Sequence, residues 1–312
     1  MAMTNPRPDS AASVGRRLAP RLGVANPGIA NYLELTGCPY EPGMLIGEGG
    51  MAQVYLGTHR QSGRLAAIKV PKGGEWARER FRQEIEAMDR LEHPHVMPLL
   101  EADPQRRWFA MPWAEYSLRE LHRCDPFDWP ALRKALSSIA GAMMHAHSNG
   151  CIHRDASPDN LLRLRNAHWA LSDFGIAKLE GDQSFGTETG ERFGTRDFSA
   201  PEVHVDPASA TAAADCWSIG ALASWFTSIR QGQTPSSEQE SAWLALIEGT
   251  MCHEPAQRWT LPRIAAHLDS LPAMRPLIAV AMSPAEICAR CGVGAGLDGS
   301  QRCRGCGFIE EY

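Results

Sequence analysis

Long hydrophobic runs are scarce in this chain of 312 residues. A helix that spans a bilayer needs about 20 apolar residues, and the longest apolar stretches, such as Ile219 to Phe226, have only the length of a core segment. The first 28 residues carry several arginines among proline, alanine and serine, but they lack the apolar stretch of a signal peptide. We therefore expect no membrane insertion, no secretion and a cytoplasmic location.

An excess of positive charge is also missing. The formal net charge is −5, and the 31 lysines and arginines are spread along the chain instead of forming one block. Proteins that bind nucleic acid through charge carry a concentrated basic surface. Nucleic acid is therefore not an expected partner.

The length predicts one large and one small unit, because single domains usually span about 50 to 250 residues. We interpret residues 1–39 as a mobile N-terminal arm and residues 40–271 as the large domain. Residues 272–286 contain three prolines and are typical of a linker. Residues 287–312, which contain four of the nine cysteines, form the small unit.

Two kinds of local pattern divide the large domain. Short β-type runs broken by glycine between residues 40 and 71 predict a three-stranded antiparallel meander. Residues 76–91 show helical spacing of apolar side chains, and residues 96–101 and 108–113 predict two further strands. Helical patterns then prevail, most clearly over 131–150. The prediction is a small β-rich lobe followed by a large helical lobe.

A glycine-rich stretch, Gly47 to Val54, lies between two predicted strands, where glycine lets the backbone approach phosphates. A hairpin without a ligand is the simpler alternative. Lys69 ends an apolar strand, so its ammonium either holds an anion or extends to solvent. Glu84 falls on the apolar stripe of the helix between Phe81 and Met88, where a carboxylate needs a cation. We expect Lys69 and Glu84 to pair.

The segment HRDASPDN, His153 to Asn160, joins two acids, an amide and two basic residues between apolar runs. It is typical of a polar catalytic loop between a helix and a strand. Further motifs follow in a fixed order: DFG at 173–175, APE at 200–202, DCWSIG at 215–220 and Arg258 in EPAQR.

Over residues 40–271 this ordered set resembles the eukaryotic-like serine/threonine protein kinase family. The resemblance implies an α+β, bilobal protein-kinase fold. Its small β-rich N-lobe would cover residues 40–111, its hinge 112–117 and its large helical C-lobe 118–271. The implied activity is transfer of the γ-phosphoryl group of ATP to serine or threonine hydroxyls of a protein substrate.

The resemblance also assigns roles to five residues. Lys69, positioned by Glu84, would contact the α- and β-phosphates of ATP. Asp155 would accept or orient the proton of the substrate hydroxyl. Asn160 and Asp173 would bind Mg²⁺, for which Mn²⁺ could substitute.

The implied nucleotide site combines the glycine-rich loop with apolar residues of both lobes. Met111 would be the gatekeeper, the adenine would lie between Val54, Ala67 and Leu162, and Pro112 to Ala114 would form the hinge. The full set is Gly47, Gly49, Gly50, Val54, Ala67, Lys69, Met111, Ala114 and Leu162.

Two positions depart from the family pattern. Ser157 stands where the family usually has a lysine that steadies the γ-phosphate, and Ala52 replaces the third glycine of the loop. A hydroxyl can donate a hydrogen bond but supplies no charge. An active kinase is the main prediction. The alternatives are a pseudokinase, meaning a nucleotide-binding scaffold, and a small-molecule phosphotransferase.

The segment around APE favours a protein substrate. Thr195 stands where protein kinases place a threonine that helps to seat the acceptor residue. Glu202 can pair with Arg258 and anchor a peptide-binding platform. We expect Asp215 to brace the catalytic loop from a buried helix.

Regulation is predicted in the segment between DFG and APE. Arg154 is either a structural cation or the receptor of a phosphate on this segment. We expect autophosphorylation at Thr187 or Thr189, with Ser184 as a further candidate.

Four cysteines near the C-terminus form two CxxC pairs with eleven residues between them: Cys288, Cys291, Cys303 and Cys306. This spacing resembles a zinc ribbon with a structural, tetrahedral Zn²⁺ site, and metal binding would supply most of the folding free energy of so small a unit. A redox pair and an iron–sulfur site are the alternatives. The ribbon could dock on the kinase, bind a partner protein or contact nucleic acid. We expect the other five cysteines to be reduced.

Overall fold

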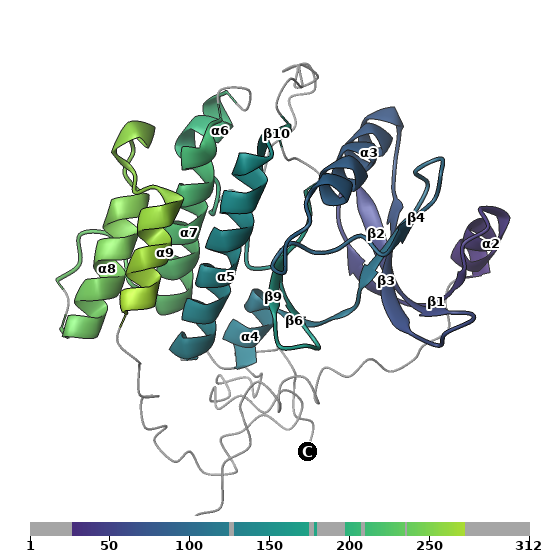
Figure 1. Ribbon diagram of the computed structural model, residues 1–312, viewed down its shortest axis with the longest axis horizontal. Helices are drawn as coiled ribbons and strands as arrows, with labels where there is room; N and C mark the ends of the chain where they lie inside the picture. The colour runs from purple at the N-terminus through teal and green to yellow at the C-terminus, as the bar shows by residue number, and fades with distance from the viewer. Residues whose placement is uncertain are drawn as a thin grey trace, which may run out of the picture.

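The structure is a computed structural model, and it describes residues 27–124, 128–174, 178–179, 197–206, 210–234 and 236–271. A small lobe built around a β-sheet stands beside a larger lobe of helices (Figure 1). This arrangement confirms the expected β-rich N-lobe and helical C-lobe.

Five strands form the N-lobe sheet, and all their pairings are antiparallel. The order across the sheet is β1-β2-β3-β5-β4. Their bounds are β1 Tyr40–Glu48, β2 Ala52–His59, β3 Leu65–Pro71, β4 Glu101–Ala102 and β5 Phe109–Pro112. The predicted meander corresponds to β1, β2 and β3.

The two faces of the sheet pack against different helices. Successive side chains of a strand point to opposite faces. Ala66 and Ile68 of β3 therefore belong to the hydrophobic cluster on one face of the sheet, and Ala67 belongs to the cluster on the other face. The cluster around Ala67 includes Phe81 and Ile85 of helix α3 (Glu75–Arg90). Lys69, two positions after Ala67, therefore lies on the face of the sheet that α3 covers.

Helix α2 (Pro27–Leu35) covers the outer face of the sheet, beyond β1 (Figure 1). Leu33 is 1% exposed, and the hydroxyl of Tyr32 donates to the carbonyl of Arg107 at 3.2 Å. The prediction of a mobile arm through residue 39 is thus wrong for residues 27–39. The arm composition hides the spacing of Ile29, Tyr32 and Leu33, which gives the helix one apolar face. Residues 1–26 lie outside the described ranges.

The strand predicted over 96–101 is largely absent, because only Glu101 and Ala102 pair as β4. The backbone N–H of Met97 donates to the carbonyl of Leu171 at 2.8 Å, and the N–H of Leu171 donates to the carbonyl of His95 at 2.8 Å. Pro98 has no N–H to donate. This segment therefore ties the N-lobe to the C-lobe instead of continuing the sheet.

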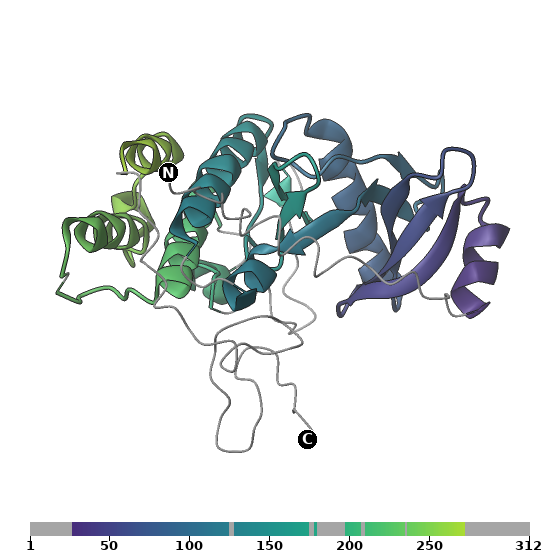
Figure 2. The ribbon, with the colours of Figure 1, turned by 90° about the horizontal axis from the view of Figure 1, so that it is seen from below.

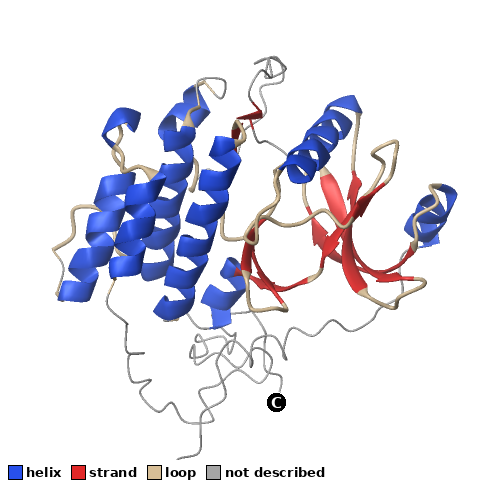
Figure 3. Ribbon diagram, in the orientation of Figure 1, coloured by secondary structure: helices blue, strands red, loops and turns tan. Residues whose placement is uncertain are grey.

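Helices α5, α7, α8 and α9 pack alongside one another in the C-lobe (Figure 2). The C-lobe also contains short strands, on the side that faces the N-lobe (Figure 3). The helices are α4 Leu118–Cys124, α5 Trp129–Ser148, α6 Pro201–Val205, α7 Ala212–Thr227, α8 Glu238–Thr250 and α9 Leu261–Ser270. The strands are β6 Ala114–Ser117, β7 Cys151–Ile152, β8 Leu161–Leu164, β9 Trp169–Leu171 and β10 Lys178–Leu179.

Local sequence explains where the longest helix begins. The side chain of Asp128 accepts a hydrogen bond from the N–H of Ala131 at 3.0 Å, and Pro130 stands in the first turn. Both features favour a helix start. In the part of the chain that the structure describes, no helix is long and apolar enough to cross a membrane.

Candidate active site

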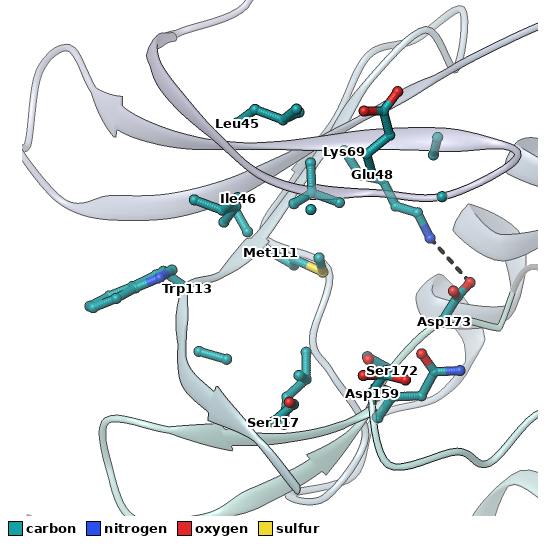
Figure 4. A pocket seen from close by; sticks show the side chains of 18 of the residues that line it. Leu45, Ile46, Glu48, Lys69, Met111, Trp113, Ser117, Asp159, Ser172 and Asp173 are labelled. Carbon is teal, nitrogen blue, oxygen red and sulfur yellow. Dashed lines mark hydrogen bonds and ion pairs between the residues drawn. The ribbon is translucent and has the colours of Figure 1, made fainter. Parts of the chain in front are cut away.

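A cleft of about 820 Å³ opens between the lobes. Figure 4 shows Leu45 and Ile46 on its N-lobe side, Met111 at the junction of the lobes and Ser117 on its C-lobe side. All nine residues predicted for the nucleotide site line this cleft, and so do Glu84, Asn160 and Asp173. The structure therefore brings residues from five separate motifs to one cavity.

Lys69 links two acids in the cleft. Its Nζ lies 2.6 and 2.8 Å from the two carboxylate oxygens of Glu84 and 3.1 Å from Oδ1 of Asp173 (Figure 4 draws the latter contact). The predicted pairing with Glu84 is confirmed. Burial alone lowers the pKa of Lys69, but Asp173 and Glu84 outweigh burial and raise it above its ordinary value. The ammonium is therefore charged at neutral pH.

Glu84 is 3% exposed on the inner face of α3. Its burial raises the pKa of this carboxyl above its ordinary value, and Lys69 offsets only part of that rise. Because Nζ of Lys69 contacts both oxygens, we take the pair as ionised in the folded protein. A carboxylate at this depth would be costly without that cation.

Hydrogen bonds between residues of the loop itself stabilise the predicted catalytic loop. The N–H of Asp155 donates to Nδ1 of His153 at 3.2 Å, so His153 carries its proton on Nε2 and donates it to the carbonyl of Ser172 at 3.0 Å. The side-chain amide of Asn160 donates to the carbonyl of Asp155 at 2.8 Å. Asp155 is not among the residues that line the cleft, but Asn160 connects it to them.

Two residues of the site have backbone angles that side chains other than glycine seldom adopt. The φ angle of Arg154 is 68° and that of Asp173 is 65°. Such conformations persist only where the surroundings impose them, and they cluster at functional sites. They set the directions of the adjacent Asp155 and of the Asp173 carboxylate.

Asp215 imposes the conformation at Arg154. It is fully buried in α7, and its two oxygens accept from the backbone N–H of Arg154 at 2.8 Å and of His153 at 3.0 Å. The predicted bracing role is confirmed. Nε2 of His147 in α5, a residue that no sequence motif singled out, lies 2.7 Å from Oδ2 of Asp215. Burial alone would raise the pKa of Asp215, but His147 and the backbone donors lower it.

The glycine-rich loop tolerates its departure from the family pattern. Ala52 lies within strand β2, opposite Pro71, and its carbonyl accepts from the N–H of Gly49 at 2.9 Å. A Cβ at Gly50 would meet nothing within 4 Å, so there is open space beside the loop at this residue. The backbone N–H groups of a glycine-rich loop can bind a phosphate group where such space is available.

Asn160 and Asp173 fit the predicted Mg²⁺ site. The amide nitrogen of Asn160 faces Asp155, which leaves its oxygen as a ligand, and the side chain of Asp173 is 40% exposed toward the cleft. Mg²⁺ in kinases takes a few protein oxygens together with phosphate and water. Within the described ranges, no three His, Cys, Asp or Glu side chains cluster as a metal site by themselves.

Arg258 and Glu202 form the predicted ion pair. Two guanidinium nitrogens of Arg258 lie 2.6 and 2.8 Å from the carboxylate of Glu202, and the Arg258 side chain is inaccessible to solvent. The guanidinium also lies 5.0 Å from the ring centre of Trp217. The pair joins α6 to the C-lobe core.

The prediction from sequence missed some residues that line the cleft, and some of the predicted site residues lie in parts of the chain that the structure does not describe. Leu45 and Ile46 line the cleft directly before Gly47, and an apolar pair next to the glycine-rich stretch was the available signal. Eight predicted residues lie outside the described ranges: Ser184, Thr187, Thr189, Thr195, Cys288, Cys291, Cys303 and Cys306.

Comparison with known proteins agrees with this geometry. A sequence profile described as "Protein kinase domain" matches residues 40–242. The chain is 38% identical over 185 residues to the serine/threonine-protein kinase PknK of Mycobacterium tuberculosis, which covers 56% of this chain and 16% of that protein. It is 33% identical over 197 residues to CBL-interacting protein kinase 25 of Oryza sativa subsp. japonica, which covers 59% of this chain and 38% of the relative. The chain thus spans much less than the full length of these relatives.

Proposed function

The chain belongs to the protein kinase family, and on that premise we propose that it is an ATP- and Mg²⁺-dependent protein serine/threonine kinase. The observation that carries this proposal is the contact of Lys69 with both Glu84 and Asp173 in a cleft that Asn160 connects to Asp155. These residues come from four distant parts of the chain. A stabilising ion pair would need only Lys69 and one carboxylate, so the meeting of all these groups favours a catalytic role.

The residues support a balanced transfer step. Asp155 accepts the proton of a serine or threonine hydroxyl, whose oxygen forms a bond to the γ-phosphorus of ATP. The bond from that phosphorus to the β,γ-bridging oxygen breaks, and the electron pair leaves with ADP. Lys69 holds the α- and β-phosphates during the step. Asn160 and Asp173 would hold Mg²⁺ or Mn²⁺, which would supply positive charge to the phosphates.

The nucleotide base is proposed to lie at the inner end of the cleft. Val54 and Ala67 would contact the adenine from the N-lobe and Leu162 from the C-lobe, with Met111 behind it. The hinge strand supplies backbone groups for the edge of the base. Pro112 can contribute only its carbonyl.

A protein substrate is favoured over a small molecule by the Glu202–Arg258 pair. It anchors α6, the helix that follows the segment expected to seat the acceptor residue. A small metabolite needs no such platform. The pseudokinase alternative rests on Ser157 alone, because Ala52 is accommodated in β2.

Regulation by autophosphorylation is proposed on the position of Arg154 within the catalytic loop, directly before Asp155. Thr187 and Thr189 are the main acceptor candidates, and Ser184 is a third. Replacement of Thr187 and Thr189 by alanine should lower activity after preincubation with ATP. Unchanged activity of that double variant would remove this part of the proposal.

A zinc ribbon at the four C-terminal cysteines is also proposed, on their spacing. It would hold one structural Zn²⁺ and offer a surface for a partner protein. A reducing, cytoplasmic location is proposed because the five cysteines outside the two CxxC pairs are scattered singly along the chain. Metal analysis of the full chain should find one zinc per chain, and Cys303→Ser should reduce that content.

The test of the activity is incubation of the full chain with labelled ATP, Mg²⁺ and a general protein substrate, beside the Asp155→Ala variant. Label that depends on Asp155 supports the kinase. Nucleotide binding without any transfer would favour the scaffold instead. Transfer only to small molecules would favour a phosphotransferase.

A further inference from the structure

The loop that carries Asp155 contributes no cation of its own toward the transferred phosphate. The four residues between Asp155 and Asn160 are alanine, serine, proline and aspartate. Ser157 is 2% exposed, and its carbonyl accepts from the N–H of Asn160 at 3.0 Å. Yet the γ-phosphoryl group carries negative charge over its three equatorial oxygens in the transition state, and nearby cations stabilise that charge.

Four basic side chains line the cleft among the described residues: Lys69, Arg80, Arg119 and Arg123. Lys69 is held by Glu84 and Asp173. Arg119 donates from Nε to both oxygens of Asp159, at 2.7 and 2.8 Å. Arg123 is exposed on α4, the helix that comes directly after the predicted hinge in the chain.

Arg80 occupies a different position. It lies on α3 four residues before Glu84, so both side chains share one face of the helix. Arg80 is 5% exposed, and its guanidinium lies 5.4 Å from the ring centre of Trp76, which supports it from one side. Arg80 lines the same cleft as Lys69 and Asp173.

A buried arginine that reaches a phosphate-binding cleft is well suited to an anion. Its planar guanidinium presents several N–H donors and matches phosphate oxygens in pairs. The neighbouring arginine Arg78, by contrast, is exposed on the outer face of the same helix. The helix therefore directs one arginine inward and leaves another in solvent.

We propose that Arg80 is a γ-phosphate-binding residue that supplies from α3 the positive charge missing from the catalytic loop at Ser157. This inference rests on the proposed kinase function. It also makes phosphate binding depend on the position of α3, because Arg80 and Glu84 move together as parts of one helix.

The test compares nucleotides that differ only in the γ-phosphate. Isothermal titration with Mg²⁺ measures the affinity for ADP and for a non-hydrolysable ATP analogue with a β,γ nitrogen bridge. Arg80→Ala should weaken the analogue roughly tenfold or more and change ADP by less than about twofold, since one charge-assisted contact is lost. The matched control Arg78→Ala should change neither.

A second arm uses rescue. Ser157→Lys places a cation in the loop, so in the Arg80→Ala background it should restore analogue affinity and the rate of transfer in part. Ser157 is buried, so the folding of this variant is checked by thermal unfolding. Arg80→Lys, which keeps the charge, gives an independent arm and should retain most of the preference for the analogue.

Two results would overturn the proposal. Equal weakening of ADP and analogue by Arg80→Ala would show that Arg80 only supports α3, and unchanged affinity for both would show that it touches no phosphate. Neither result concerns whether the wild-type chain transfers phosphate. Failure of the kinase function would appear separately, as absence of Asp155-dependent label in the wild-type protein.

Discussion

Replacement of Asp215 by asparagine tests how the buried helix α7 shapes the catalytic loop. The carboxylate uses Oδ1 for the N–H of Arg154 and Oδ2 for both the N–H of His153 and the ring of His147. An amide has only one oxygen. Its NH₂ group must therefore face a backbone N–H on one side, where donor meets donor.

The magnitude follows from these contacts. Hydrogen bonds to a charged group contribute about 1.5–3 kcal/mol each, and an unsatisfied buried donor costs about 1–3 kcal/mol. Asparagine can keep the hydrogen bonds of only one of the two oxygens, and it lacks the negative charge of the carboxylate. We expect the free energy of unfolding to fall by about 2–4 kcal/mol, which lowers Tm by roughly 5–15 °C for a domain of this size. Activity should fall further than stability, because Arg154 loses the contact that holds its left-handed backbone beside Asp155.

Thermal unfolding and steady-state kinetics below Tm measure the two effects. His147→Ala removes a single contact and should cost about 1–2 kcal/mol, while the exposed Asp89→Asn should change stability by no more than about 0.5 kcal/mol. The reasoning fails if Asp215→Asn unfolds within the range of the Asp89 control and retains wild-type kcat.

Three further predictions concern other contacts. Lys69→Met should abolish transfer and leave Glu84 buried without its cation, so ATP titration should show weaker binding and calorimetry a lower Tm; full transfer activity would contradict the assigned role. Arg258→Ala should cost about 3–5 kcal/mol because the guanidinium is fully buried, and a double-mutant cycle with Glu202→Gln should show strong coupling; additive effects would argue against the pair. Burial lowers the pKa of His93, so below about pH 6.5 the unfolded chain binds more protons than the folded chain, and the free energy of unfolding should fall as the pH drops. Urea unfolding at pH 7.5 and 5.5 should show a smaller loss of unfolding free energy in His93→Gln than in wild type. An equal loss in both proteins would exclude His93 as the source of the pH dependence.

Local sequence was informative wherever one short segment specified both an element and its face. The apolar spacing from Phe81 to Met88 predicted a helix and its phase, and the phase placed Glu84 inward, where Lys69 contacts it. This inference succeeded because side-chain direction follows directly from helical periodicity. For Lys69 the sequence left two alternatives, and the structure shows it held by the carboxylates of Glu84 and Asp173.

Prediction failed where a segment takes its structure from a distant partner. The segment over 96–100 has the composition of a strand, but the N–H of Met97 donates to Leu171 of the other lobe. Residues 27–35 become a helix against the outer face of the sheet. Neither partner can be identified from local pattern. Burial against another element overrides local propensity in both cases.

The sequence alone determined the order of motifs, the two-lobed α+β architecture and the chemical types of the groups at the cleft. Only the tertiary structure decided which of those groups meet. It placed His147 against Asp215, turned Arg80 into the cleft while Arg78 stayed in solvent, and accommodated Ala52 in a regular strand. The reason is physical: residue types set which interactions are available, but the distance between residues far apart in the chain depends on how the lobes pack around a shared core.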